Sequence, residues 1–184
     1  MEPGTGRGGA GLKLLTGLWR LHPAWLAALC VAMFVAGAAV SDQPLPGVTI
    51  YSLTWIALLL WVHSIYAFSR TALVERGRSR RNLDWVFLVA AIGAPLFWIR
   101  LGLVMAGYPE WLTAPHPSQV IGLPVIIAFF GAFGLTAFEL AYAEREERPT
   151  PFGGAVFGRF LLLVYFPIGA WFIRPRLRRI EDRA

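Results

Sequence analysis

The sequence contains few of the residues from which active sites are usually built. Its one cysteine, Cys30, excludes a disulfide within the chain and a Cys-x-x-Cys metal or redox motif. Its aspartates, Asp42, Asp84 and Asp182, are too few for the aspartate-rich metal sites of phospholipid-synthesising transferases. The His-Glu-x-x-His, P-loop and dinucleotide-binding glycine motifs are also missing. We therefore expect no catalytic residue, metal site or cofactor of a familiar type.

Charged residues are scarce as well. They make up 15% of the chain, against 57% hydrophobic residues and a mean hydropathy of +0.56. A soluble domain carries about 25% charged residues, so the composition indicates one small membrane domain. The net charge is +6, but the basic residues flank apolar runs. We expect them to contact anionic lipid headgroups, each worth about 1 kcal/mol near the surface, and expect no nucleic-acid partner.

Four long apolar runs are present, at residues 23–40, 48–68, 85–107 and 119–143. Each is long enough to cross a bilayer core of about 30 Å at a rise of 1.5 Å per residue. The expected fold is an all-α integral membrane protein, a four-span antiparallel bundle over residues 23–154. Residues 1–22 form a cytoplasmic or interfacial N-terminal segment, and residues 155–184 a membrane-embedded segment with a basic tail.

The basic residues fix the expected threading. Of the 17 lysines and arginines, all except Arg100 lie on one side of the membrane when the N-terminus is placed in the cytoplasm. This bias is what the positive-inside rule describes. We expect a multi-pass protein with both termini cytoplasmic, in a membrane of the bacterial cytoplasmic type. The basic residues on that side are Arg7, Lys13, Arg20, Arg70, Arg76, Arg78, Arg80, Arg81, Arg145, Arg148, Arg159, Arg174, Arg176, Arg178, Arg179 and Arg183.

The first apolar run has two interpretations. A positive start, an apolar stretch and Ala36-Gly37-Ala38 as a cleavage site are typical of a signal peptide. The apolar stretch is long for such a peptide, which favours an uncleaved signal-anchor. We expect the signal-anchor.

A fifth apolar run, residues 155–173, is long enough to cross the membrane, but the arginines that follow it do not suit a crossing. A crossing would carry the arginines from Arg174 onward to the outer side. Pro167 removes a backbone donor beside Gly169, which tolerates an unusual turn, so a break is expected there. We predict a re-entrant or in-plane segment that returns to the cytoplasmic side, with a true crossing as the alternative.

Four ionisable residues in or near the apolar runs are candidate functional residues, because charges within a membrane are costly. His63 and Glu139 are expected at similar depth and could face each other as a proton-handling pair. Arg100 is expected to pair with Asp42 or Glu110, or to bind an anionic ligand from the outer side. Arg159 lies near the start of the fifth run. The alternative for His63 and Glu139 is purely structural.

Haem is disfavoured by the positions of the histidines, which are His22, His63 and His116. Bis-histidine ligation needs two histidines at matching depth on facing helices. In the expected threading His22 and His116 lie at opposite surfaces, and His63 lies at least one turn from the depth of His22. No two histidines match.

For function we prefer a non-enzymatic subunit or scaffold that packs with itself or with a larger membrane complex. A stripe of small residues at Ala128, Gly131 and Gly134 would allow another helix to approach closely. The alternative is a small channel or transporter with a polar path near His63, Glu139 and Arg100, and the third option is a lipid-modifying enzyme. Convergence of the candidate residues on one cavity would favour the alternatives.

Overall fold

The computed structural model describes residues 18–40, 44–75, 77, 82–105, 107, 115–144, 152–166 and 168–182. Every regular element in this part of the chain is a helix, so the predicted all-α fold is confirmed. The elements are η1 (Leu18–Arg20), α2 (Pro23–Ala39), α3 (Pro44–Glu75), α4 (Asp84–Met105), α6 (Pro115–Glu144), α7 (Phe152–Val164) and α8 (Ile168–Glu181).

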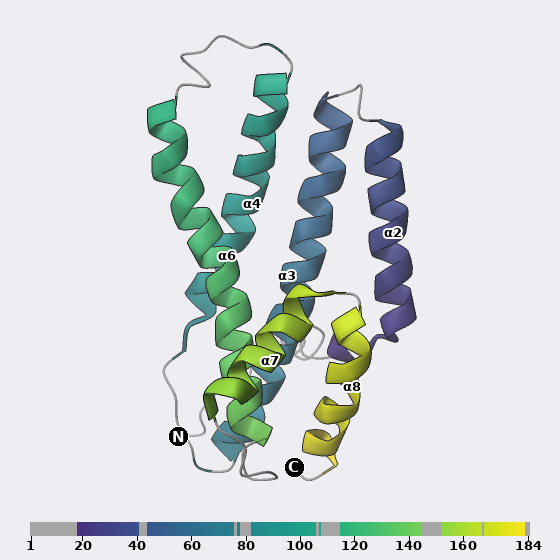
Figure 1. Ribbon diagram of the computed structural model, residues 1–184, viewed down its shortest axis with the longest axis vertical. Helices are drawn as coiled ribbons and strands as arrows, with labels where there is room; N and C mark the ends of the chain where they lie inside the picture. Colours follow the sequence, from purple (N-terminus) through teal and green to yellow (C-terminus); the bar gives the residue numbers. More distant parts are fainter. Residues whose placement is uncertain are drawn as a thin grey trace, which may run out of the picture.

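Helices α2, α3, α4 and α6 stand side by side along the long axis and alternate in direction (Figure 1). Helix α3 is central, because it contacts η1, α2, α4, α6 and α8. Helices α7 and α8 form a hairpin at the lower end of the view; α7 rises along α6, and α8 returns beside α3 and below α2 (Figure 1). The structure is thus a four-helix bundle with a shorter helical hairpin at one end.

Two helices are long and apolar enough to cross a membrane, judged by length and composition. They are α3, from Pro46 to Glu75, and α6, from Leu123 to Glu144. Three other apolar helical stretches are shorter: Ala24–Ala39 of α2, Asp84–Phe97 of α4 and Gly153–Val164 of α7.

The helices extend beyond the apolar runs of the sequence, into the intervening residues 41–47, 69–84 and 108–118. Helix α3 already begins at Pro44 and α6 at Pro115. Proline is tolerated in the first turn of a helix, where the missing amide would have no intrahelical acceptor, so these prolines start helices. Helix α3 also continues past residue 68 to Glu75. Gly77 and Gly107, with φ of 74° and 73°, follow α3 and α4 in the left-handed region that glycine readily adopts.

The buried core is concentrated where the hairpin packs against the bundle. Its fully buried large side chains include Ile65, Leu140, Leu163, Ile173 and Leu177, which come from α3, α6, α7 and α8. These side chains are apolar and lie where α7 and α8 pack against α3 and α6, so their burial holds the hairpin to the bundle.

Helices α4 and α6 come closest together at Gly93. A Cβ atom added to Gly93 would lie 2.5 Å from Cγ2 of Val125. In the predicted stripe, a Cβ on Gly131 would lie 3.7 Å from Val86, and a Cβ on Gly134 would meet nothing within 4 Å in the described chain. Gly93 is thus a tighter contact between α4 and α6 than the stripe is, and the close approach of another helix to the stripe stays a prediction.

Several hydroxyl groups within the helices donate to carbonyls of the same helix, whereas the buried hydroxyls of Ser52 and Ser69 make no hydrogen bond within the described chain. Thr54 donates to Ile50 at 2.8 Å, and Thr136 donates to Ala132 at 2.9 Å. Ser64 donates to the carbonyl of Trp61 at 2.6 Å. Such bonds satisfy a hydroxyl without a partner on another helix, which suits helices with apolar surroundings.

The fifth apolar run breaks near Pro167, as predicted. Helix α7 ends at Val164 and α8 begins at Ile168. The second piece does not end at residue 173, however. It continues to Glu181 as an amphipathic helix, because apolar side chains recur at helical spacing among the arginines. The buried residues of α8 are Gly169, Ala170, Ile173, Leu177 and Ile180.

Candidate functional site

His63 points into the bundle and has an acidic partner. Its side chain is 20% exposed, and Nε2 lies 3.4 Å from Oδ1 of Asp84. The ring packs edge-on against Phe87 at 4.9 Å between centroids. Asp84 is the first residue of α4, and its amide donates to Oδ1 of Asn82 at 3.0 Å. The sequence predicts Glu139 as the partner of His63, and Asp84 lies outside the apolar runs.

Tyr66 is close to this pair, with its ring centroid 6.1 Å from that of His63. Its side chain is 1% exposed, and its hydroxyl accepts the amide of Leu83 at 3.2 Å. The same hydroxyl is within electrostatic reach of Asp84 and Glu139. Glu139 is itself buried, at 6% exposure. Both predicted residues thus face the interior near Tyr66, and a direct or water-bridged hydrogen bond between His63 and Glu139 stays a prediction.

Glu144, the last residue of α6, forms a separate ionic cluster. Its Oε2 accepts from Nε of Arg159 at 3.1 Å and also from Nη2 of Arg159. Nη1 of Arg176 lies 3.3 Å from the same oxygen. The side chains of Glu144 and Arg159 are only 10% and 13% exposed. One carboxylate therefore joins α6, α7 and α8.

The candidate residues do not gather into one site. Glu139 and Glu144 are five positions apart on α6, which places them about 140° apart around the helix at about 100° per residue. Glu139 faces the surroundings of Tyr66, whereas Glu144 faces the hairpin and binds Arg159. Arg159 thus belongs to the ionic cluster at the hairpin.

Glu144 and Arg176 were not singled out by the sequence. Glu144 begins a run of charged residues after the fourth apolar run, which is typical of a solvent-exposed helix end. Arg176 is one of several arginines in the tail. Their pairing depends on the return of α8 beside the bundle, which no local spacing encodes.

A second ion pair ties η1 to α8. Arg20 binds Glu181 through its Nη2, and the backbone carbonyl of Arg20 accepts from Nη2 of Arg174 at 3.3 Å. This pair is more exposed, with side chains of Arg20 and Glu181 at 65% and 36%. His22, one of the histidines weighed for haem, accepts the amide of Ala24 at its Nδ1 at 3.2 Å and so caps α2.

Arg100 lies on α4, away from these clusters, and is half-buried. The expected partners Asp42 and Glu110 fall outside the described residues, so the predicted pairing stays a prediction. Within the described ranges, no group of three or more His, Cys, Asp or Glu side chains could hold a metal ion.

Comparison with known protein families, with curated proteins and with solved structures gives no match for this chain.

Proposed function

We propose that the chain is a four-span membrane protein in which α2, α3, α4 and α6 cross the bilayer. Large apolar side chains exposed on the outer faces of these helices support this threading, among them Trp25, Phe34, Leu88, Ile92 and Ile127. In water such a continuous apolar surface would promote association. In a bilayer, lipid acyl chains contact this surface and keep it out of water. The exposed apolar side chains therefore favour a membrane location.

The position of the charges supports the orientation. Helix α2 contains no charged residue, and Arg70, Glu75, Asp84, Glu139 and Glu144 lie at the ends of α3, α4 and α6 nearest the hairpin. In the proposed threading this end is cytoplasmic, in a bacterial-type cytoplasmic membrane. Both termini lie on that side, and the hairpin enters the membrane and returns, which keeps the arginines of α8 inside.

We propose that the protein is a non-enzymatic subunit or scaffold, which packs with itself or with a larger membrane complex. The observation that carries this is the ionic cluster of Glu144, Arg159 and Arg176. Its buried charges stabilise the contact of three helices instead of facing a cavity. Helix α2 offers a surface for packing, because Val31, Phe34 and Val35 are 61%, 68% and 59% exposed.

The test is the mass of the full chain purified in mild detergent, measured by light scattering with the detergent contribution subtracted. A scaffold that self-associates should give a whole-number multiple of 20.4 kDa greater than one, and a heteromeric subunit should elute with a partner at fixed stoichiometry. A monomer that elutes alone in both detergent and lipid nanodiscs would contradict the proposal.

A small proton channel or transporter is the second candidate. It is favoured by the grouping of His63, Asp84, Tyr66 and Glu139 at one end of the bundle. Proteoliposomes that enclose a pH-sensitive dye test it directly. We expect no proton flux above that of protein-free vesicles. Flux that disappears in Glu139→Gln and His63→Ala, but not in the matched surface variant Glu75→Gln, would replace the scaffold proposal with the transporter.

A further inference from the structure

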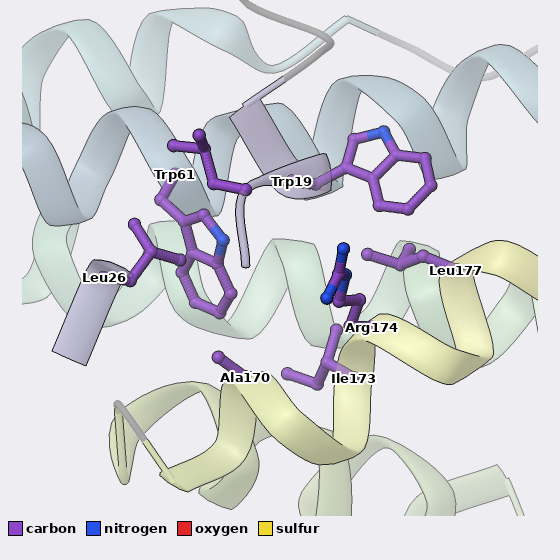
Figure 2. A pocket seen from close by; sticks show the side chains of 8 residues that line it. Trp19, Leu26, Trp61, Ala170, Ile173, Arg174 and Leu177 are labelled. Carbon is purple, nitrogen blue, oxygen red and sulfur yellow. The ribbon is translucent and has the colours of Figure 1, made fainter. Parts of the chain in front are cut away.

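A notch opens between η1, α2, α3 and α8 (Figure 2). The residues that matter for its chemistry are Trp61 of α3 and Arg174 of α8. Apolar walls come from Trp19, Leu26 and Leu177. Figure 2 shows the indole of Trp61 and the guanidinium of Arg174 on either side of the same space.

Two buried hydrogen-bond donors in this notch have no acceptor. Nε1 of Trp61 and Nε of Arg174 are both buried, and neither makes a hydrogen bond within the described part of the chain. Buried polar atoms in proteins almost always have a partner. Both groups can only donate, so the missing partner must supply acceptor oxygens.

The charge at the notch favours an anion. Arg20 is neutralised by Glu181, whereas Arg174 has no acidic partner among the described residues. The notch therefore carries one uncompensated positive charge. Arginine binds phosphate oxygens through well-directed N–H groups.

The surroundings favour a lipid over a free ion. Leu21, which also lines the notch, is 44% exposed, and beyond it the outer face of α2 presents Trp25 and Leu29 at 74% and 46% exposure. This apolar surface would receive an acyl chain. The other apolar residues that line the notch are at most 8% exposed. Leu21 and Arg174 therefore form the mouth. The notch as it stands has no room for a water molecule, so both side chains must rotate before a ligand oxygen can reach the donors.

We propose that this notch binds the phosphate group of an anionic phospholipid, with Nε1 of Trp61 and the guanidinium of Arg174 as donors and the outer face of α2 as the acyl-chain surface. The site rests on the proposed membrane location, because it needs the mouth at the level of the inner headgroups. It adds a defined lipid to the general contact expected from the basic residues.

The test uses the full chain, delipidated in detergent and titrated with phosphatidylglycerol, with bound lipid counted by native mass spectrometry. Trp61→Phe removes the N–H donor with its five-membered ring and keeps a six-membered aromatic ring against Phe166, which lies 5.0 Å from Trp61 between centroids. Arg174→Lys keeps the charge but removes the Nε donor. Each variant should weaken lipid binding about tenfold, as expected for one lost hydrogen bond to a charged group.

Trp55→Phe is the matched control, because Trp55 is on the same helix, packs against Phe129 and does not line the notch. It should bind lipid like the unchanged chain. Equal binding in all three variants would overturn the proposal. Binding of inorganic phosphate by a chain that binds no phosphatidylglycerol would identify a free-anion site instead. Light scattering on the same samples keeps the outcomes separate, since loss of the lipid site should leave the assembled mass unchanged.

Discussion

Two carboxylates, Glu144 and Glu181, each bind an arginine far away in the sequence, but they do so in different surroundings. The side chains of Glu144 and Arg159 are nearly buried, whereas those of Glu181 and Arg20 are partly open to solvent. An exposed pair contributes little, because solvent screens it. Removing one member of a buried pair leaves a charge without compensation. The two pairs should therefore differ sharply in their effect on stability.

Glu144→Gln should destabilise the folded protein by about 3 kcal/mol, because Arg159 and Arg176 then lack their counter-charge in a mostly buried position. Glu181→Gln, the exposed counterpart, should cost less than about 1 kcal/mol. Thermal unfolding in detergent, followed by circular dichroism, measures both. Equal shifts of the two midpoints would show that the Glu144 cluster does not hold the hairpin.

At the scale of the helices, Gly93 and Gly169 are the two glycines of the described chain with the least space for a side chain. Gly93 faces Val125 where α4 meets α6, and Gly169 faces the carbonyl of Leu162 where α8 turns back on α7. A side chain at either position must push two helices apart, since the neighbouring atoms are packed.

Gly93→Ala should destabilise the protein by about 1–3 kcal/mol, because the new methyl group overlaps Val125. Gly134→Ala on α6 is the control. It meets nothing within 4 Å in the described chain and should be neutral or stabilising by up to about 1 kcal/mol from helix propensity. Rescue of Gly93→Ala by Val125→Ala would confirm that overlap is the cause. A Gly93→Ala protein as stable as the control would contradict the α4–α6 contact.

Gly169→Ala should open the hairpin, because the added Cβ would overlap the backbone carbonyl of Leu162, which cannot rotate away as a side chain could. Limited proteolysis of the purified chain should then cut between α7 and α8 at an increased rate. The control is Gly158→Ala in α7, where nothing lies within 4 Å in the described chain. Identical digestion of both variants would exclude a tight turn at Gly169.

At the scale of the whole molecule, burial and charge are distributed unevenly. The hairpin end carries the buried core and the ion pairs, while the outer faces of the bundle expose apolar side chains. This division agrees with the proposed membrane location. The packed, charged end would lie at one membrane surface, and the apolar outer faces would contact lipid or a partner.

The threading gives a direct prediction. In a Cys30→Ala background, a cysteine at Ser41 should react with a membrane-impermeant reagent in intact cells, and a cysteine at Ser79 should not. A fluorescent reporter fused after Ala184 should be active in the cytoplasm, because the positive-inside rule keeps the arginines of α8 there. An enzyme reporter that is active only outside the cytoplasm should stay inactive at the same site. Reversed cysteine labelling would contradict the threading of the four helices. Normal labelling with a reporter that is active only outside the cytoplasm would mean that the fifth run crosses the membrane.

The sequence by itself determined the helices, because apolar runs, prolines and glycines act locally. The break near Pro167 and the positions of α2, α3, α4 and α6 could be predicted for that reason, although α3 continues well past residue 68 to Glu75. The tertiary structure alone decided the partners. Asp84 lies beside His63 because α4 begins there, and Glu144 binds Arg159 and Arg176 because the hairpin folds back. Such contacts depend on how helices distant in sequence pack, which helical periodicity does not specify.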